Sequence, residues 1–523
     1  MILSRLLRGS VIALLVAALP AAEPKVANDP AVTMSPFEVS AESVDFKGWI
    51  KLGTPHFTLY TDAKEKDAAN VLRELEFMRW AAQDFMRREL CPRAPTVLVL
   101  PTSRSDWRKI ASKGAMVEWR VAMSAPAQRI TNLLLAEYDW QDEGLDLVRS
   151  AFGRSLLPAM NLGGPFTYEQ GIGLFFETAE IEKDKVSFGR ANAMRVAPLL
   201  HEGWMPWGQF FRVTPISEEY RSQWKIHRLG AQAAVFVQYM LSNPEPAWLE
   251  RLMDWNARRV ADADPKEEEF KAIFGVDWKG WQKIMEDYVR GGRYQIMSIR
   301  VPPALAAMQP AKLELPVREM RELFVIAQVL NQHVPASQAA LDSFLAKGLK
   351  TASLRELLVE ACMRRSRTEP KARLLREIIA GGTSNAAVFI ELARDVTGQA
   401  LFRPTLHRRI GSEAGEVREL CRRALALDPL FLEANHLLAF TYAYGPDSGP
   451  DNVKAIEEIY RRITGSMRTN DVVLDAGVAH WRAGNVAAAV KIAQMILDSP
   501  YADQGDKTIA AELKAALAAG AKP

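Results

Sequence analysis

Strand-like patterns in this chain of 523 residues occur only before residue 145, and that distribution constrains the fold more than any other feature. Residues 56–62 (HFTLYTD) alternate as a half-buried strand does, and residues 96–102 and 129–135 are two further strand candidates. A helix is expected over residues 71–85, where apolar side chains recur at helical spacing. After residue 145 the spacing is helical, for example over residues 229–240. Strands followed by helices predict an α+β fold with a small N-terminal sheet.

The start of the chain indicates export. Residues 1–22 contain two arginines, an apolar run over residues 11–19, and the small residues Ala21 and Ala22 before a polar segment. This pattern is typical of a secretory signal peptide, and the apolar run is too short to span a bilayer. We therefore expect a mature protein in the periplasm or outside the cell. Its first part, residues 23–45, lacks periodicity and is expected to be extended.

Charge and cysteine content narrow the function classes. The net charge is +3, and it falls to +1 without the two arginines of the signal peptide, so nothing favours a nucleic-acid partner. The three cysteines, Cys91, Cys362 and Cys421, allow one internal disulfide at most. A bridge between Cys362 and Cys421 and a pair of buried free thiols are the two alternatives, and no CxxC pair is present.

A composition change marks a domain boundary near residue 300. Twelve of the thirteen tryptophans precede it, and only Trp481 follows. Three prolines, of which Pro302 and Pro303 are adjacent, predict a linker over residues 301–310. The α+β domain is accordingly expected over residues 46–300.

The C-terminal part carries a repeat pattern. The segment ALALDP at residues 424–429 closes a helix, and Leu438, Ala439 and Tyr442 follow at fixed offsets. Small residues repeat the pattern after an insertion at residues 445–450. This resembles tetratricopeptide (TPR) repeats, placed at residues 416–517, with residues 311–415 TPR-like by continuity. The resemblance implies an array of helical hairpins that binds a protein or peptide.

Several stretches of the front domain resemble the peptidase-MA-like branch of the gluzincins, the thermolysin-type zinc peptidases. They are GWIKLGTPHFTLYTDA, TVLVLPT, GPFTYEQGIGLFFET and FGVDWKGWQKIMEDYVRGGRY, in that order. The resemblance covers roughly residues 46–300 and implies a helical peptidase-like domain with a small sheet.

The zinc motif of that family is replaced in this chain. The family carries HExxH on a helix, with two histidine ligands and a glutamate base, and takes a third ligand from a glutamate on the next helix. In the matching helix, residues 145–157, Arg149 and Gly153 stand at the histidine positions and Ser150 at the glutamate position. Gln170 stands at the position of the third ligand.

These replacements remove the chemistry. Arginine does not lose its proton to bind zinc, glycine has no ligand atom, and serine is no base without a partner. No histidine lies between His56 and His201, so no shifted alignment restores the site. We therefore expect no catalytic residues, no metal and no cofactor. Arg149 is expected either to face Glu169 or Gln170 or to point to solvent.

Two nearby features were considered as sites. His201 and Glu202 begin an HE pair, but Met205 occupies the second ligand position, which excludes a zinc motif. Trp204 and Trp207 form either an exposed aromatic binding surface or a loop packed on the next helix. Together with the former peptidase cleft, the candidate binding residues are Arg149, Glu169, Gln170, Trp204 and Trp207.

Three functions are compatible with these patterns. The leading one is an exported pseudopeptidase that acts as a protein-binding or peptide-binding scaffold in the cell envelope. The second is a hydrolase that uses Glu169, His201, Glu202 or His227 in the same cleft, which requires these side chains to converge. The third assigns function to the TPR-like region alone, with the front domain as a platform.

Overall fold

The structure is a computed structural model, and it describes a large part of the chain from Phe46 onwards. The described residues are 46–86, 95–103, 106, 121–123, 130–136, 144–159, 165–190, 193–222, 225–242, 246–262, 264–292, 294–331, 339, 341–343, 345–346, 351–398, 406, 410–447, 449–463 and 470–521. The expected signal peptide, the extended segment 23–45 and Cys91 lie outside these residues.

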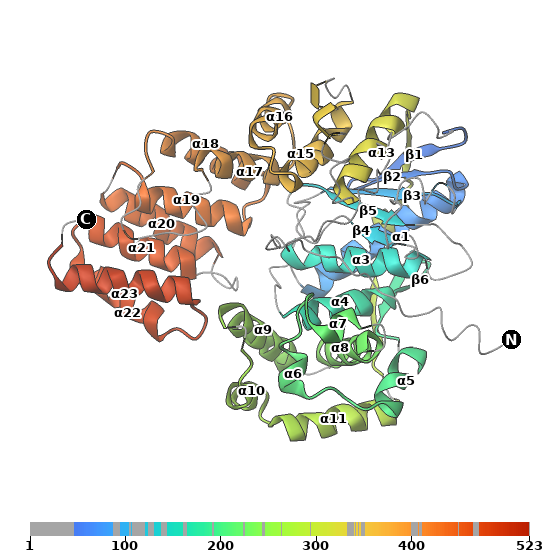
Figure 1. Cartoon of the computed structure of the whole chain (residues 1–523), viewed down its shortest axis with the longest axis horizontal. Coiled ribbons are helices and arrows are strands. Elements are labelled where there is room, and N and C mark those ends of the chain that lie inside the picture. The colour runs from blue at the N-terminus through green and yellow to red at the C-terminus, as the bar shows by residue number, and fades with distance from the viewer. Residues whose placement is uncertain are drawn as a thin grey trace, which may run out of the picture.

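A six-stranded sheet with the order β4-β5-β3-β2-β1-β9 forms the core of the N-terminal half of the chain, which we call the front half (Figure 1). Its strands are β1 (Ile50–Gly53), β2 (Phe57–Thr61), β3 (Thr96–Leu100), β4 (Val121–Met123), β5 (Asn132–Ala136) and β9 (Ala311–Leu313). The strands β2, β3 and β5 are parallel, whereas β1, β4 and β9 run antiparallel to their neighbours. Helix α1 (Glu65–Met86) connects β2 to β3, as parallel pairing requires. The three expected strands and the first helix are thus confirmed.

A second, three-stranded sheet lies later in the chain. It consists of β6 (Glu180–Glu182), β7 (Lys185–Phe188) and β8 (Met297–Arg300), all antiparallel. The prediction that all segments after residue 145 are helical is therefore wrong for β6 to β9. These strands have three or four residues, which is too short for an alternating pattern to be recognised.

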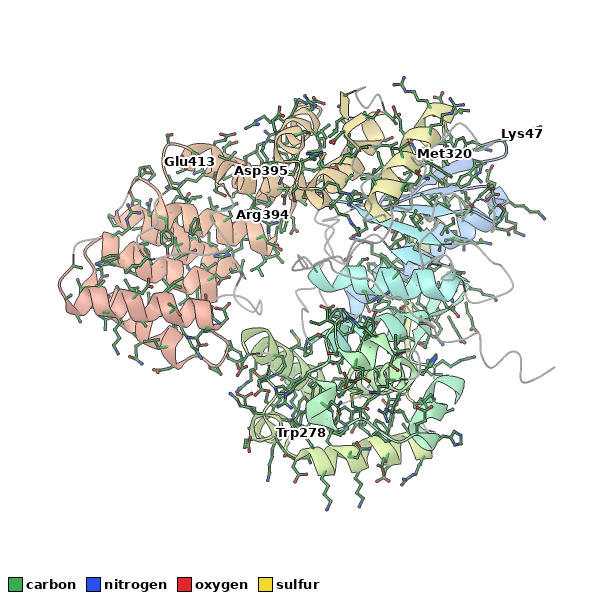
Figure 2. All side chains as sticks on the ribbon, viewed as in Figure 1. Lys47, Trp278, Met320, Arg394, Asp395 and Glu413 are labelled. Atoms are coloured by element: carbon green, nitrogen blue, oxygen red, sulfur yellow. The ribbon has the colours of Figure 1, made fainter. Side chains whose placement is uncertain are left out.

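The central sheet is buried on both faces. Val97 and Val99 of β3 belong to one hydrophobic cluster, whereas Leu98 and Leu100 belong to the other, because successive side chains alternate across a strand. The second face packs against α1 and α3 (Gly144–Ala159). The first face packs against α13 (Val317–Asn331) and α15 (Arg355–Arg364), and Figure 2 marks Met320 of α13.

The sheet and its covering helices continue across the expected linker. Residues 301–310 contain the short helix α12 (Pro303–Ala306), and β9 directly after them pairs with β1. A buried ion pair fixes α13 to the sheet, since Lys51 Nζ lies 2.6 Å from Glu319 Oε1. The hydroxyl of Tyr60 donates to the same oxygen at 2.6 Å. The first core therefore includes residues on both sides of position 300.

Eight helices of the described chain form the lower part of the molecule in Figure 1. They are α4 (Phe166–Glu177), α5 (Ala193–His201), α6 (Trp207–Phe210), α7 (Glu218–Arg221), α8 (Lys225–Ser242), α9 (Pro246–Ala261), α10 (Glu267–Phe274) and α11 (Trp278–Gly291), the last with Trp278 marked in Figure 2. Trp255 and Trp281 are fully buried where α9, α10 and α11 meet.

The C-terminal helices form a stack that extends away from the sheet (Figure 1). After η2 (Ala352–Leu354) and α15 come α16 (Thr368–Ala380), α17 (Ala386–Val396), α18 (Ala414–Leu427), α19 (Leu432–Tyr444), α20 (Pro450–Ile463), α21 (Asn470–Arg482), α22 (Val486–Asp498) and α23 (Gln504–Ala518). From α15 onwards each helix packs against the next, and α21 also contacts α19 and α23. The expected helix end in ALALDP is confirmed at Leu427.

The far end of the stack returns to the front half. Tyr501, between α22 and α23, lies with its ring 5.3 Å from the guanidinium carbon of Arg258 on α9. Its hydroxyl also donates a hydrogen bond to Asp254 of α9, which contributes to raising the pKa of Tyr501. The stack therefore touches the front half at both of its ends.

Both described cysteines, Cys362 on α15 and Cys421 on α18, are buried free thiols. Burial raises the pKa of Cys362 to about 12, so this thiol is inert as a nucleophile at neutral pH. Among the described residues, no helix combines the length and apolar character needed to cross a membrane.

Candidate functional site

Arg149, which the gluzincin resemblance would place at the first ligand position, lies in an ion-pair network. Its Nη2 atom is 2.7 Å from Glu74 Oε2 on α1, and its Nη1 atom is 2.9 Å from Asp146 Oδ1 on α3. The side chain is only 15% exposed. Both expected orientations, towards Glu169 or Gln170 and towards solvent, are therefore wrong. Arg149 ties α3 to α1.

Gly153, which the gluzincin resemblance would place at the second ligand position, lies where α3 packs closely against α4. A Cβ atom placed on Gly153 would lie 2.5 Å from Cβ and 2.6 Å from Cγ of Phe176. Ser150 is 2% exposed, and a Cβ atom on Gly173 would lie 2.9 Å from its Oγ atom. The two helices thus use these positions for close packing, and no side chain fits at Gly153 unless Phe176 moves.

Gln170, which the resemblance would place at the third ligand position, is buried on α4. It is 8% exposed, and its neighbour Gly171 faces α8 so closely that a Cβ atom would lie 2.4 Å from the carbonyl oxygen of Ala233. Helix α4 is therefore held tightly on two sides, by α3 and by α8.

Glu169 is a titratable group at the same junction. Burial raises its pKa to about 7, against the opposing charge of Arg154 on α3. Burial also lowers the pKa of Arg154, which interacts with Glu169, Glu177 and Tyr220. A carboxyl group that titrates near neutrality is the one feature here that acid–base catalysis could use.

The aromatic candidates form part of the core. Trp207 is 2% exposed, and its ring centroid lies 5.9 Å from that of Trp204 and 6.1 Å from that of Trp281. Its Nε1 atom donates to Gln282 Oε1 at 2.8 Å. The exposed-surface interpretation is wrong for Trp207, because α11 covers it, and Trp204 is half-buried beside it.

The second hypothesis needs Glu169, His201, Glu202 or His227 to converge. His201 and Glu202 are exposed at the end of α5, whereas His227 is half-buried on α8. No hydrogen bond or ion pair found within the described ranges joins any two of these four side chains. Met205, which stands where a second ligand would follow the HE pair of His201 and Glu202, is 1% exposed. Its carbonyl oxygen accepts a hydrogen bond from Gln232 at 3.0 Å.

Sequence reasoning missed a cluster on the C-terminal stack, composed of His436 on α19, Asp471 and Asp475 on α21, and Asp506 on α23. His436 Nδ1 lies 3.5 Å from Asp471 Oδ2, and His436 Nε2 lies 3.7 Å from Asp475 Oδ2. The spacing of Asp471 and Asp475 places both on one helix face, and this was the available signal. The contribution of α23 had no signal in the sequence.

No group of three or more His, Cys, Asp or Glu side chains is arranged to hold a metal ion in the part of the chain that the structure describes. Comparisons of the chain with protein-family models, with curated proteins and with solved structures find no match.

Proposed function

We propose that this chain is an exported, non-catalytic pseudopeptidase that serves as a protein-binding or peptide-binding scaffold in the cell envelope. The observation that carries the proposal is the contact between Gly153 and Phe176. The side chain of Phe176 fills the place that the gluzincin resemblance assigns to a zinc ligand.

The neighbouring positions support the same conclusion. Arg149 is paired with two carboxylates, and Ser150 is buried with no hydrogen-bond partner for its Oγ atom among the described residues. A zinc peptidase needs neutral imidazoles, a carboxylate base and an open coordination position. The residues at the family's positions supply none of these.

The binding role is assigned to the C-terminal stack. Its helices pack in sequence, and α21 also packs against α19 and α23. Arrays of helical hairpins such as TPR repeats present extended surfaces to peptides and proteins, since each hairpin contacts only its neighbours. The repeat pattern of residues 416–517 and this packing support a TPR-like array.

A peptidase assay tests the non-catalytic part. The mature chain, residues 23–523, is incubated with casein and with a mixed peptide library, with added zinc and with a chelator. We expect no hydrolysis under either condition. Hydrolysis that zinc restores and a chelator abolishes would overturn the proposal.

The second candidate is a hydrolase that uses non-standard residues in the same cleft. The specific observation in its favour is Glu169, whose pKa of about 7 suits a general acid or base. In the same assay, chelator-insensitive hydrolysis that Glu169→Gln abolishes would support this candidate, whereas no hydrolysis by the unaltered chain would remove it.

A further inference from the structure

Four side chains from three adjacent helices form what we call the His436–aspartate cluster: His436, Asp471, Asp475 and Asp506. Asp475 is at its centre, with a side chain 5% exposed. His436 and Asp471 are 30% and 37% exposed and form its solvent side. Asp506 is half-buried at the start of α23. The cluster thus runs from the surface of the stack to a buried carboxylate.

Asp475 lacks the partners that a buried carboxylate normally has. Its Oδ2 atom is buried and accepts no hydrogen bond from the residues that the structure describes, and His436 Nε2 lies 3.7 Å away, beyond hydrogen-bond distance. Buried carboxylates in folded proteins are nearly always hydrogen-bonded or paired, since desolvation of an unpaired charge is costly. This oxygen is aimed at the cluster and remains available to a donor.

The negative groups around Asp475 make ionisation of its carboxyl group still less favourable. Burial, together with the nearby Asp471 and Asp506, raises the pKa of Asp475 well above its usual value. Burial, the nearby Asp471 and Asp503, and a hydrogen bond with Asp471 raise the pKa of Asp506 to about 8. Within the described residues, His436 is the only basic side chain paired with any of these carboxylates. The cluster therefore lacks positive charge.

Asp503 has a separate role. Its Oδ1 atom accepts from the backbone N–H of Asp506 at 2.8 Å and caps the N-terminus of α23. Capping explains its position, but no comparable local hydrogen bond explains Asp475.

We propose that the His436–aspartate cluster binds a cationic side chain, the ammonium of lysine or the guanidinium of arginine, from a peptide segment of the protein partner. This inference rests on the proposed function, in which the stack holds that partner. A long side chain with a charged tip can pass the half-exposed His436 and Asp471 and bring its donors to Asp475. Several N–H donors on one cation match several carboxylate oxygens, and such charge-assisted hydrogen bonds are strong.

A cation should compete with protons for the carboxylate oxygens of the His436–aspartate cluster. The groups that face Asp475 are His436 from α19, Asp471 from its own helix, and Asp506 from α23. As Asp475 and Asp506, whose pKa values are raised, lose protons, their attraction for a cation grows. Affinity should therefore rise between pH 6 and pH 8.

The test measures peptide binding to the mature chain by fluorescence anisotropy in near-physiological salt. The probes are three fluorescein-labelled Gly-Ser peptides of equal length that carry lysines, arginines or glutamates at the same positions. We expect the lysine or arginine peptide to bind and the glutamate peptide not to bind. Asp475→Asn should weaken that binding by about tenfold or more, because it removes a buried charge from the pair.

Glu512→Gln is the matched control, since it removes one negative charge from an exposed position on α23. It should change affinity by less than about twofold, as rim charges do. Asp475→Asn should unfold at or above the temperature of the unaltered chain, because it relieves a buried charge. If it does not fold, Asp471→Asn, half-exposed, takes its place in the comparison.

Equal binding of all three peptides, or equal effects of Asp475→Asn and Glu512→Gln, would overturn the inference. Failure of the proposed function has a different signature, which is chelator-sensitive hydrolysis by the same preparation. The two failures are thus distinguishable in one set of samples.

Discussion

Gly153 on α3 and Phe176 on α4 are so close that a methyl group on Gly153 would lie 2.5 Å from Cβ of Phe176. Real Cβ atoms do not approach so closely, and the clash involves an atom next to the backbone, which side-chain rotation does not move. Glycine at this position is therefore required by the packing of α3 on α4. The position that the proposed gluzincin resemblance assigns to a zinc ligand is thus a contact between two helices.

The first prediction concerns this contact. Gly153→Ala should lower the free energy of unfolding by about 1–3 kcal/mol, because the extra methyl group overpacks the α3–α4 interface. Urea unfolding followed by circular dichroism measures the change. Gly415→Ala on α18 is the control, since nothing lies within 4 Å of its Cβ position, and it should stabilise by about 0.5–1 kcal/mol. Equal stability of the two variants would contradict the packing argument.

Restoring the motif should not restore the site. The combined substitutions Arg149→His, Ser150→Glu, Gly153→His and Gln170→Glu recreate the family's residue types. We expect no stoichiometric zinc on this variant and a lower unfolding temperature, because an imidazole at position 153 has no room beside Phe176. Zinc is measured by elemental mass spectrometry after dialysis. Tight binding of one zinc per chain with unchanged stability would show that the α3–α4 contact is easily opened.

A third prediction concerns where the chain can be cut. A fragment that ends at residue 300 loses β9 and α13, and this exposes Tyr60, Val97 and Val99 on one face of the sheet. We expect such a fragment to aggregate, whereas a fragment ending at residue 398 should remain monomeric. Size-exclusion chromatography of both fragments from residue 46 checks this. A folded, monomeric fragment 46–300 would contradict a core that includes residues on both sides of position 300.

The fourth prediction is a pH dependence of stability. The pKa of Asp506 is raised to about 8 from an unfolded value of about 3.9, so the folded state binds more protons between these values. Stability should therefore fall as pH rises from 5 to 8, by about 1–2 kcal/mol for the cluster. Urea unfolding at both pH values measures the fall.

Asp506→Asn should reduce that fall, and Asp451→Asn, whose side chain is 94% exposed, should leave it unchanged. Glu169 contributes in the same direction, since its pKa is also raised, so part of the fall persists in Asp506→Asn. Stability that rises over this pH range in the unaltered chain would contradict the charge assignment.

Part of the fold could be predicted because its signals are local. The strand at residues 96–102 is a continuous apolar run, and α1 keeps one apolar face over many turns. β9 has three exposed residues and carries no pattern, yet it extends the sheet by pairing with β1 more than two hundred residues earlier. Long-range pairing of this kind leaves no periodic signal.

The candidate site was also predictable only where the signal is local in the sequence. Residue types alone predicted that Arg149, Ser150 and Gly153 lack zinc chemistry. The orientation of Arg149 depends on Glu74 of α1, and the raised pKa of Asp475 depends on its burial between helices, on Asp471 and on Asp506 of α23. Both partners lie far away in the sequence, so the network and the His436–aspartate cluster could be found only from the assembled helices.

We infer that the centre implied by the gluzincin resemblance is closed by packing and holds no catalytic metal, and the metal content of the unaltered mature chain tests this inference. Elemental mass spectrometry of protein purified without chelators gives the number of zinc ions per chain. We expect far less than one zinc ion per chain. One tightly bound zinc per chain would contradict it, because the residues at Arg149, Ser150, Gly153 and Gln170 could not have supplied the ligands.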